Sequence, residues 1–419
     1  MNDKAPSVAL PFRYFVTAIV AFTLAAVLLP FIASDLADFY YQPRLLALTH
    51  LITLGWITMT IMGASYQLVP VALGIRLYSE RLARIQFWFM LVGTLGMVGH
   101  FWIGRWGGLI ASALLVLIAS SLYLANLGMT LRGLTRWNVT AKSMGAALLF
   151  FAATVVLGNL MALDKVLNFL RGDFLGILHG HFHLAALGWV TMMITGVAYH
   201  LIPMFTLSEL RDEGKAHLQF WLLFVGTMGL VGSLLRGYRF LPLFAGMVVA
   251  AILLFADQMR RILKARRRRI LDWGIRHFTT ALIYLVALTP LGLLFSLGLI
   301  PDGAFGSRLA FMYGFLVLIG WVSFTIVGML YKIIPFLVWY HAYSRQVGRG
   351  PVPTLQDLCP PELQRLGYFL FNSGILGMAA GLLIGEAGLI RAFGVILTGA
   401  VLLFTFTILL VLRHLRPSW

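Results

Sequence analysis

The sequence has little charge and almost no cysteine. Only 11% of its 419 residues are charged, 60% are hydrophobic, and the mean hydropathy is +0.90. Soluble domains carry roughly 25% charged residues, so this composition excludes an ordinary water-soluble fold. The single cysteine, Cys359, excludes an intramolecular disulfide and a cluster of thiolate ligands.

Acidic residues are missing from the interiors of the long apolar runs. All fifteen lie in connections or near the ends of these runs, as Asp164, Asp257 and Glu386 do. A proton relay through a membrane usually carries carboxylates at depth. The sequence therefore gives no sign of a dedicated proton pump, although coupling through water, tyrosine or histidine stays open.

The apolar runs themselves predict membrane-spanning helices. A crossing needs roughly 20 apolar residues, and backbone groups in hydrocarbon must be hydrogen-bonded within their own segment. We expect an all-α polytopic membrane protein with about twelve transmembrane helices. Its first run lacks the small-residue cleavage pattern of a signal peptide. The expected spans lie near 11–33, 45–69, 85–104, 108–130, 143–163, 177–204, 217–235, 240–258, 278–299, 309–336, 365–385 and 389–412.

The distribution of lysine and arginine predicts the orientation. If both termini lie on one side, that side receives 24 of the 32 basic residues. The positive-inside rule then places both termini in the cytoplasm, with the chain in a bacterial-type cytoplasmic (inner) membrane. Because the net charge of +17 follows from this distribution, we expect no nucleic-acid partner. The densest basic run, 266–269, is expected to contact anionic head groups of the lipid bilayer.

One segment occurs three times along the chain. Residues 50–70 read HLITLGWITMTIMGASYQLVP, residues 183–203 read HLAALGWVTMMITGVAYHLIP, and residues 315–335 read FLVLIGWVSFTIVGMLYKIIP. The match continues into each following span, as in QFWFMLVGTLGM at 86–97 and QFWLLFVGTMGL at 219–230. The fold is therefore expected to consist of repeats of one unit.

The repeats predict a single membrane domain over 1–419. Its three four-helix repeats cover about 11–135, 142–265 and 277–415, and equivalent surfaces should pack about a pseudo-threefold axis. The repeated glycines are expected to permit close helix contact. The repeated prolines, Pro70, Pro203 and Pro335, are expected to end their helices.

Histidine is the ionisable residue that the spans do contain. His50 and His183 occupy the same position in two copies of the repeat, near the outer ends of the second and sixth spans. His179 shares a helix face with His183, whereas His181 points about 200° away. His100, near the outer end of the third span, lies at a similar depth.

These imidazoles are candidate cofactor ligands. Neutral imidazole binds haem iron and copper, and the absence of a CxxCH motif predicts a b-type haem. The expected cofactor ligands are His50 with His181 or His183. If copper is bound, the expected metal ligands are His179, His181, His183 and His100. The competing interpretation is that these imidazoles only cap helix carbonyls at the membrane interface.

A second set of polar residues follows the repeated tyrosines. Gln67, His200 and Lys332 could line a common cavity, although snorkelling towards the interface is the plainer explanation. The remaining histidines at the cytoplasmic ends of spans are expected to be surface groups: His217, His277, His341 and His414.

Twelve spans in three repeats, with histidines on the outer halves of the second and sixth spans, resemble subunit I of the haem-copper oxidase superfamily. The nearest branches are those of nitric oxide reductase, the C-type oxidases and the NnrS-like membrane proteins. The resemblance implies a low-spin haem bound by one histidine on the second span and one on the tenth. His50 matches the first of these, and the cluster on the sixth span lies where the family places a copper ligand.

The chain departs from this family pattern in two places. The tenth span contains no histidine, and Phe315 stands at the position of His50 and His183. The histidine pair expected after the seventh span is missing from 231–245. We therefore expect no standard binuclear haem-copper centre, and a haem or copper ion that has moved to the second and sixth spans.

The resemblance favours a membrane protein that binds haem, with or without copper. Such a protein would act in respiratory electron transfer or nitric oxide handling. If it turns over, it would be an oxidoreductase that does not reduce oxygen by the standard mechanism. An electron or gas partner would approach from the periplasmic side, and a homo-oligomer is compatible with the sequence. The alternatives are a transporter or channel on the same scaffold and a non-catalytic assembly partner.

Overall fold

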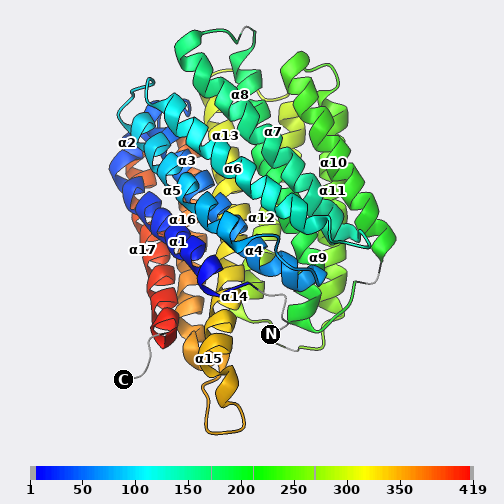
Figure 1. Cartoon of the computed structure of the whole chain (residues 1–419). Helices are drawn as coiled ribbons and strands as arrows, with labels where there is room; N and C mark the ends of the chain where they lie inside the picture. Colours follow the sequence, from blue (N-terminus) through cyan, green and yellow to red (C-terminus); the bar gives the residue numbers. More distant parts are fainter. Residues whose placement is uncertain (1–5, 171, 211, 269, 416–419) are drawn as a thin grey trace. The chain divides into compact units, whose positions relative to one another are not determined.

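The computed structural model describes residues 6–170, 172–210, 212–268 and 270–415. Twelve helices in this part of the chain are long and apolar enough to cross a membrane, which confirms the predicted number. No strand occurs within these ranges, so the all-α class is confirmed as well. Figure 1 shows the helices in chain order.

Several spans are built from more than one helical segment. The helices are α1 (Ala9–Leu28), η1 (Leu29–Ile32), α2 (Ala33–Leu36), α3 (Pro43–His50), η2 (Leu51–Thr58), α4 (Met59–Leu73), α5 (Glu80–Trp102), α6 (Leu109–Leu131), α7 (Val139–Leu167), α8 (Phe174–His183), η3 (Leu184–Thr191), α9 (Met192–Thr206), α10 (Glu213–Arg236), α11 (Leu241–Lys264), α12 (Trp273–Ser296), α13 (Ala304–Phe315), η4 (Leu316–Ser323), α14 (Phe324–Tyr343), η5 (Ser344–Gln346), α15 (Leu355–Leu358), α16 (Pro361–Ile384), α17 (Ala387–Leu412) and η6 (Arg413–Leu415).

The described residues fall into two compact units. The first unit lies within Met1–Tyr14, Ile61–Arg269 and Leu285–Pro301. The second lies within Phe15–Thr60, Ile270–Tyr284 and Asp302–Trp419. The predicted single domain, its repeat boundaries and its pseudo-threefold axis stay predictions.

Neighbouring helices pack closely where the repeat places a glycine. The pairs α5 with α6 and α10 with α11 belong to the first unit, and α16 with α17 belongs to the second (Figure 1). A Cβ added at Gly93, Gly226 or Gly374 would lie 2.9, 3.1 and 2.9 Å from a backbone nitrogen of the partner helix. The predicted role of these repeated glycines in close helix contact is therefore confirmed.

Polar side chains cap the helices at their predicted cytoplasmic ends. The Ser79 hydroxyl accepts from the backbone of Leu82 at the start of α5, and the Asp212 carboxylate accepts from Lys215 at the start of α10. Such caps satisfy backbone donors that have no partner within the helix. They fix where each span begins.

The repeated prolines do not end their helices, so that prediction was wrong. Pro70, Pro203 and Pro335 all lie inside helices, and α14 continues past Pro335 to Tyr343. Proline removes only one backbone donor, and transmembrane helices tolerate that loss because neighbouring groups satisfy the freed carbonyl.

Three spans contain an eight-residue π-helical segment, which hydrophobicity along the sequence does not predict. These segments are η2, η3 and η4. They occupy the same eight positions of the repeat and enclose its Gly-Trp pair, whose indoles, Trp56, Trp189 and Trp321, are buried. Long π-helices are rare and often mark functional sites. The three spans that contain them are also the most buried ones.

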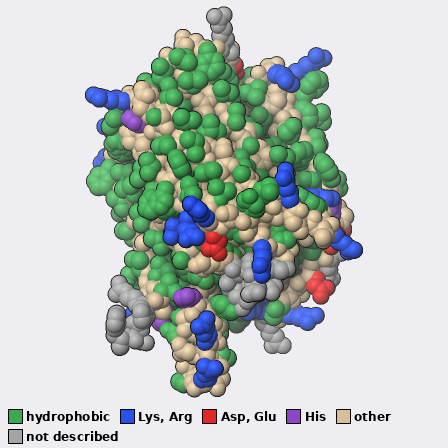
Figure 2. All heavy atoms as spheres, viewed as in Figure 1, with side chains coloured by type: hydrophobic (Ala, Val, Ile, Leu, Met, Phe, Trp, Pro, Cys, Tyr) green, Lys and Arg blue, Asp and Glu red, His purple; other side chains and the backbone are tan. Residues whose placement is uncertain are grey.

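Hydrophobic side chains cover much of the surface that Figure 2 displays. Large apolar side chains exposed on the spans include Trp88, Leu149, Trp221 and Leu376. Apolar groups of this kind face lipid in a membrane protein, so the surface agrees with the predicted bilayer environment.

Candidate histidine site

His50 and His183 take the same structural position in their repeats. Each is the last residue of an α-helical segment, α3 or α8, directly before a π-helical segment. Phe315 ends α13 in the same way, directly before η4. The structure thus supports the equivalence of these three positions that the repeat predicted.

The two histidines also make the same local hydrogen bond. Nδ1 of His50 lies 2.7 Å from the carbonyl oxygen of Leu46, and Nδ1 of His183 lies 2.7 Å from that of His179. Because a carbonyl only accepts, Nδ1 is the donor in each ring, and a neutral ring then carries its lone pair on Nε2. Histidines that bind metals are usually oriented in this way.

The His181 ring lies against α7. A Cβ added at Gly158 of α7 would lie 2.8 Å from Cε1 of His181, so the imidazole packs on that glycine. Gly180, on another side of α8, packs against Leu235 of α10. The choice between His181 and His183 as a cofactor ligand stays a prediction.

His100 is held against a glycine as well. A Cβ added at Gly108 would lie 2.0 Å from Cε1 of the His100 ring. Nδ1 of His100 is buried and has no hydrogen-bond partner among the described residues. This imidazole is therefore packed between α5 and the start of α6.

A polar contact of the first unit lies at the start of α8. The Tyr238 hydroxyl donates to the carboxylate of Asp173, the residue before α8. This hydrogen bond holds the pKa of Asp173 below its usual value. Burial and the same contact raise the pKa of Tyr238 to about 12.

The side chains present fit a haem better than a three-ligand metal ion. Within the described ranges, no group of three or more His, Cys, Asp or Glu side chains could hold a metal ion. A haem iron requires only one or two protein ligands, and Nε2 of a neutral His50 or His183 ring is the nitrogen left for it. The copper set of His100, His179, His181 and His183 stays a prediction.

The expected pairing across spans also stays a prediction. His50 belongs to the second unit and the histidines of α8 to the first. The His50 site and the α8 site are therefore described separately, each by the contacts within its own unit.

The residues after the repeated tyrosines have three different environments. Gln67 is buried, His200 is exposed, and Lys332 forms an ion pair with Asp272 in the second unit. Their common cavity and their snorkelling towards the interface both stay predictions, because Lys332 belongs to the second unit and the other two residues to the first.

His277 is not a surface group, so that prediction was wrong. Its side chain is fully buried in the second unit, where the ring packs against Phe324, Tyr331 and Tyr368. Nδ1 lies 2.6 Å from the carbonyl oxygen of Trp273. The sequence correctly predicts that this residue lies near a helix end. It does not predict which face of that helix the neighbouring helices cover.

Comparison with known proteins identifies related sequences. The family model described as "Cytochrome C and Quinol oxidase polypeptide I" matches residues 1–113 and 105–238. The "Cbb3-type cytochrome c oxidase subunit CcoN1" of Stutzerimonas stutzeri is 28% identical over 191 residues, covering 43% of this chain and 40% of the relative. A "Cytochrome c oxidase subunit 1 homolog" of Agrobacterium tumefaciens (strain T37) is 27% identical over 201 residues, covering 42% of this chain and 34% of the relative.

The chain thus matches between a third and two fifths of the length of these curated relatives. The family match includes His50, His100 and the histidines of α8. It ends before the third repeat, where Phe315 replaces histidine.

Proposed function

This chain belongs to the cytochrome c and quinol oxidase polypeptide I family, and on that basis we propose that it is a b-type haem protein of the membrane. It would act in respiratory electron transfer or in nitric oxide handling. It would do so without the standard binuclear haem-copper centre.

The observation that carries this proposal is the shared geometry of His50 and His183. Both rings are oriented by an Nδ1 hydrogen bond of 2.7 Å to the carbonyl four residues earlier. Both stand at the junction with a π-helical segment. At least one of them is the proposed axial ligand of the haem through Nε2.

The chain's own part is to orient these imidazoles and to surround them with apolar groups. The carbonyls of Leu46 and His179 fix the tautomer, so that no proton must leave Nε2 before ligation. Trp56 and Trp189, six residues after the two histidines, are buried and add apolar surface to the same spans. When bound, the haem would supply one-electron transfer or the binding of a diatomic gas.

Phe315 is the reason for separating this protein from the standard oxidases. A phenyl ring offers no lone pair for iron, and the predicted tenth span, 309–336, contains no histidine; His341 lies beyond it, in the last turn of α14. In the family, one histidine on the second span and one on the tenth bind the low-spin haem. This chain lacks the tenth-span histidine of that pair. A b-type haem is proposed because the sequence holds no CxxCH attachment motif.

The test is an absorption spectrum, reduced minus oxidised, of the purified full-length protein, with pyridine haemochrome analysis of its haem content. Sharp b-type bands are expected. His50→Ala or His183→Ala should remove or shift them. His217→Ala is the matched control, because Nδ1 of His217 also lies 2.8 Å from the carbonyl four residues earlier, at Glu213.

Two results would overturn the proposal. One is a colourless preparation from cells that are supplied with haem precursor. The other is a haem spectrum that survives in both His50→Ala and His183→Ala.

A further inference from the structure

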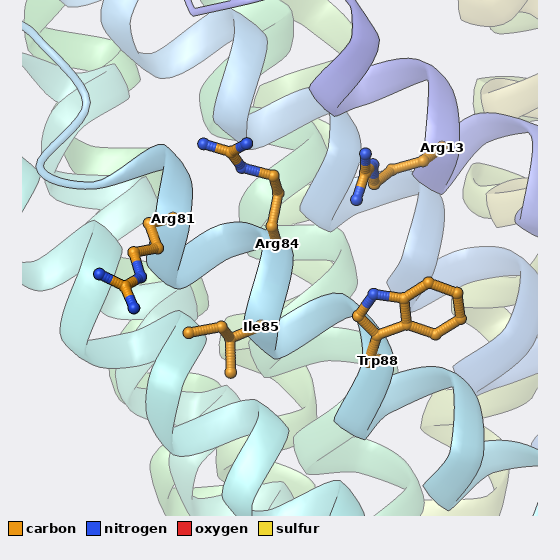
Figure 3. Close-up of a pocket in the computed structure, with 5 residues that line it drawn as sticks. All are labelled: Arg13, Arg81, Arg84, Ile85 and Trp88. Atoms are coloured by element: carbon orange, nitrogen blue, oxygen red, sulfur yellow. The ribbon is translucent and has the colours of Figure 1, made fainter.

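An open groove in the first unit is lined by three arginines and two apolar residues, without a histidine. Its volume is about 420 Å³, and it is lined by Arg13, Arg81, Arg84, Ile85 and Trp88. Figure 3 shows Arg13 on α1 and the other four residues along the neighbouring α5. All five belong to the first unit, and all stand near the ends of their spans that are predicted to be cytoplasmic.

No described carboxylate neutralises the three guanidinium groups. Among the described residues, none of the three forms an ion pair with Asp or Glu. The guanidinium of Arg13 lies over the Phe87 ring at 5.8 Å, and Nε of Arg84 donates to the backbone carbonyl of Glu80. The Glu80 carboxylate accepts from the backbone of Ser7. The groove therefore keeps a strong positive charge.

An apolar stripe continues from the groove along the same face of α5. Ile85, Trp88, Val92 and Leu95 recur at helical spacing and are 42%, 58%, 54% and 57% exposed. Positive charge at the end of a span with apolar side chains below it matches a lipid that has an anionic head and acyl chains. Guanidinium groups bind phosphate with paired hydrogen bonds, and tryptophan favours the head-group level of the bilayer.

The second repeat shows that the stripe and the arginines are separate features. Trp221, Val225 and Met228 of α10 stand at the positions of Trp88, Val92 and Leu95 and are similarly exposed. Gly214 and His217 stand at the positions of Arg81 and Arg84. The shared stripe explains ordinary contact with lipid, whereas α10 lacks the two arginines that α5 contributes to the groove.

We propose that this groove is a binding site for an anionic glycerophospholipid. The phosphodiester lies between Arg13, Arg81 and Arg84, and an acyl chain lies along Trp88 and the stripe below it. This site would hold one lipid more tightly than the bulk bilayer does.

The test uses full-length protein reconstituted in bilayers with phosphatidylcholine as the host lipid. Brominated-chain phosphatidylglycerol or brominated-chain phosphatidylcholine is added as a quencher of tryptophan fluorescence at equal mole fraction. The contribution of each indole is obtained by difference from Trp88→Phe and Trp221→Phe. Quenching of Trp88 should show about a tenfold preference for phosphatidylglycerol, whereas quenching of Trp221 should be the same with both lipids.

The charge requirement is tested with two variants that lose the same charge. Arg13→Gln/Arg81→Gln/Arg84→Gln should make the quenching of Trp88 equal to that of Trp221. Arg266→Gln/Arg345→Gln/Arg349→Gln, in exposed connections elsewhere, should keep the preference. If the first triple variant fails to fold, Arg84→Gln alone should lower the preference severalfold.

Three results would overturn the proposal. The first is equal quenching of Trp88 by the two brominated lipids. The second is a preference that persists without the three arginines. The third is a preference that millimolar inorganic phosphate abolishes, since the groove would then be a site for the free anion.

Discussion

Trp56 donates its indole N–H to the hydroxyl of Ser323 over 3.1 Å, within the second unit. This hydrogen bond joins η2 of the second span to η4 of the tenth. The Ser323 hydroxyl in turn donates to the carbonyl of Leu318, five residues earlier, over 2.7 Å. The Trp56 ring stacks on Phe22 with 4.4 Å between centroids. Two π-helical segments are thus tied together by one buried polar contact.

Ser323→Ala should destabilise the protein by about 1–3 kcal/mol, because it leaves the buried Trp56 N–H without an acceptor. Ser323→Thr should cost little, since it keeps the hydroxyl and the other two repeats carry Thr58 and Thr191 at this position. Thermal unfolding in detergent, followed by circular dichroism, measures both. Equal losses of stability in the two variants would show that the hydroxyl contributes nothing.

Gly328→Ala should destabilise the second unit by about 1–3 kcal/mol through overpacking. A Cβ there would lie 2.6 Å from the carbonyl oxygen of Gly274 and 2.7 Å from Cβ of His277, so α12 and α14 would have to separate. Gly399→Ala is the matched control in α17, because a Cβ at that position meets nothing within 4 Å. The same unfolding measurement applies, and a stable Gly328→Ala variant would contradict the close packing of these helices.

His181→Ala should leave the absorption spectrum of the haem unchanged while His183→Ala alters it. The reason is that the His181 ring packs on Gly158 of α7, away from the face of His183. Gly158→Ala should likewise displace the His181 ring without changing the bands. Loss of haem in His181→Ala would make His181 the ligand on the sixth span instead.

Tyr238→Phe should change how the protein responds to acid. The hydrogen bond from Tyr238 holds the pKa of Asp173 below its usual value, so its contribution to stability is present above that value. The contribution is lost as pH falls through the lowered pKa. Wild type should therefore lose thermal stability between neutral pH and about pH 3 by a larger increment than Tyr238→Phe. Unfolding temperatures across that range provide the measurement, and parallel curves would refute the contact.

The sequence by itself determined the class of this protein, its twelve spans and the equivalence of His50, His183 and Phe315. These features depend on local hydrophobicity and on spacing along the chain, which a bilayer converts directly into helices. The family resemblance rested on the same local pattern, and the family match to the first 238 residues agrees with it.

The tertiary structure alone decided which faces of those helices are covered. In the folded protein, His277 is buried, α14 continues beyond Pro335, and His181 packs on Gly158. The tertiary structure also introduced the π-helical segments around the repeated Gly-Trp pairs. Each outcome depends on contacts with residues distant in the chain, such as the Trp56–Ser323 hydrogen bond, and hydropathy and periodicity along one span do not encode such contacts.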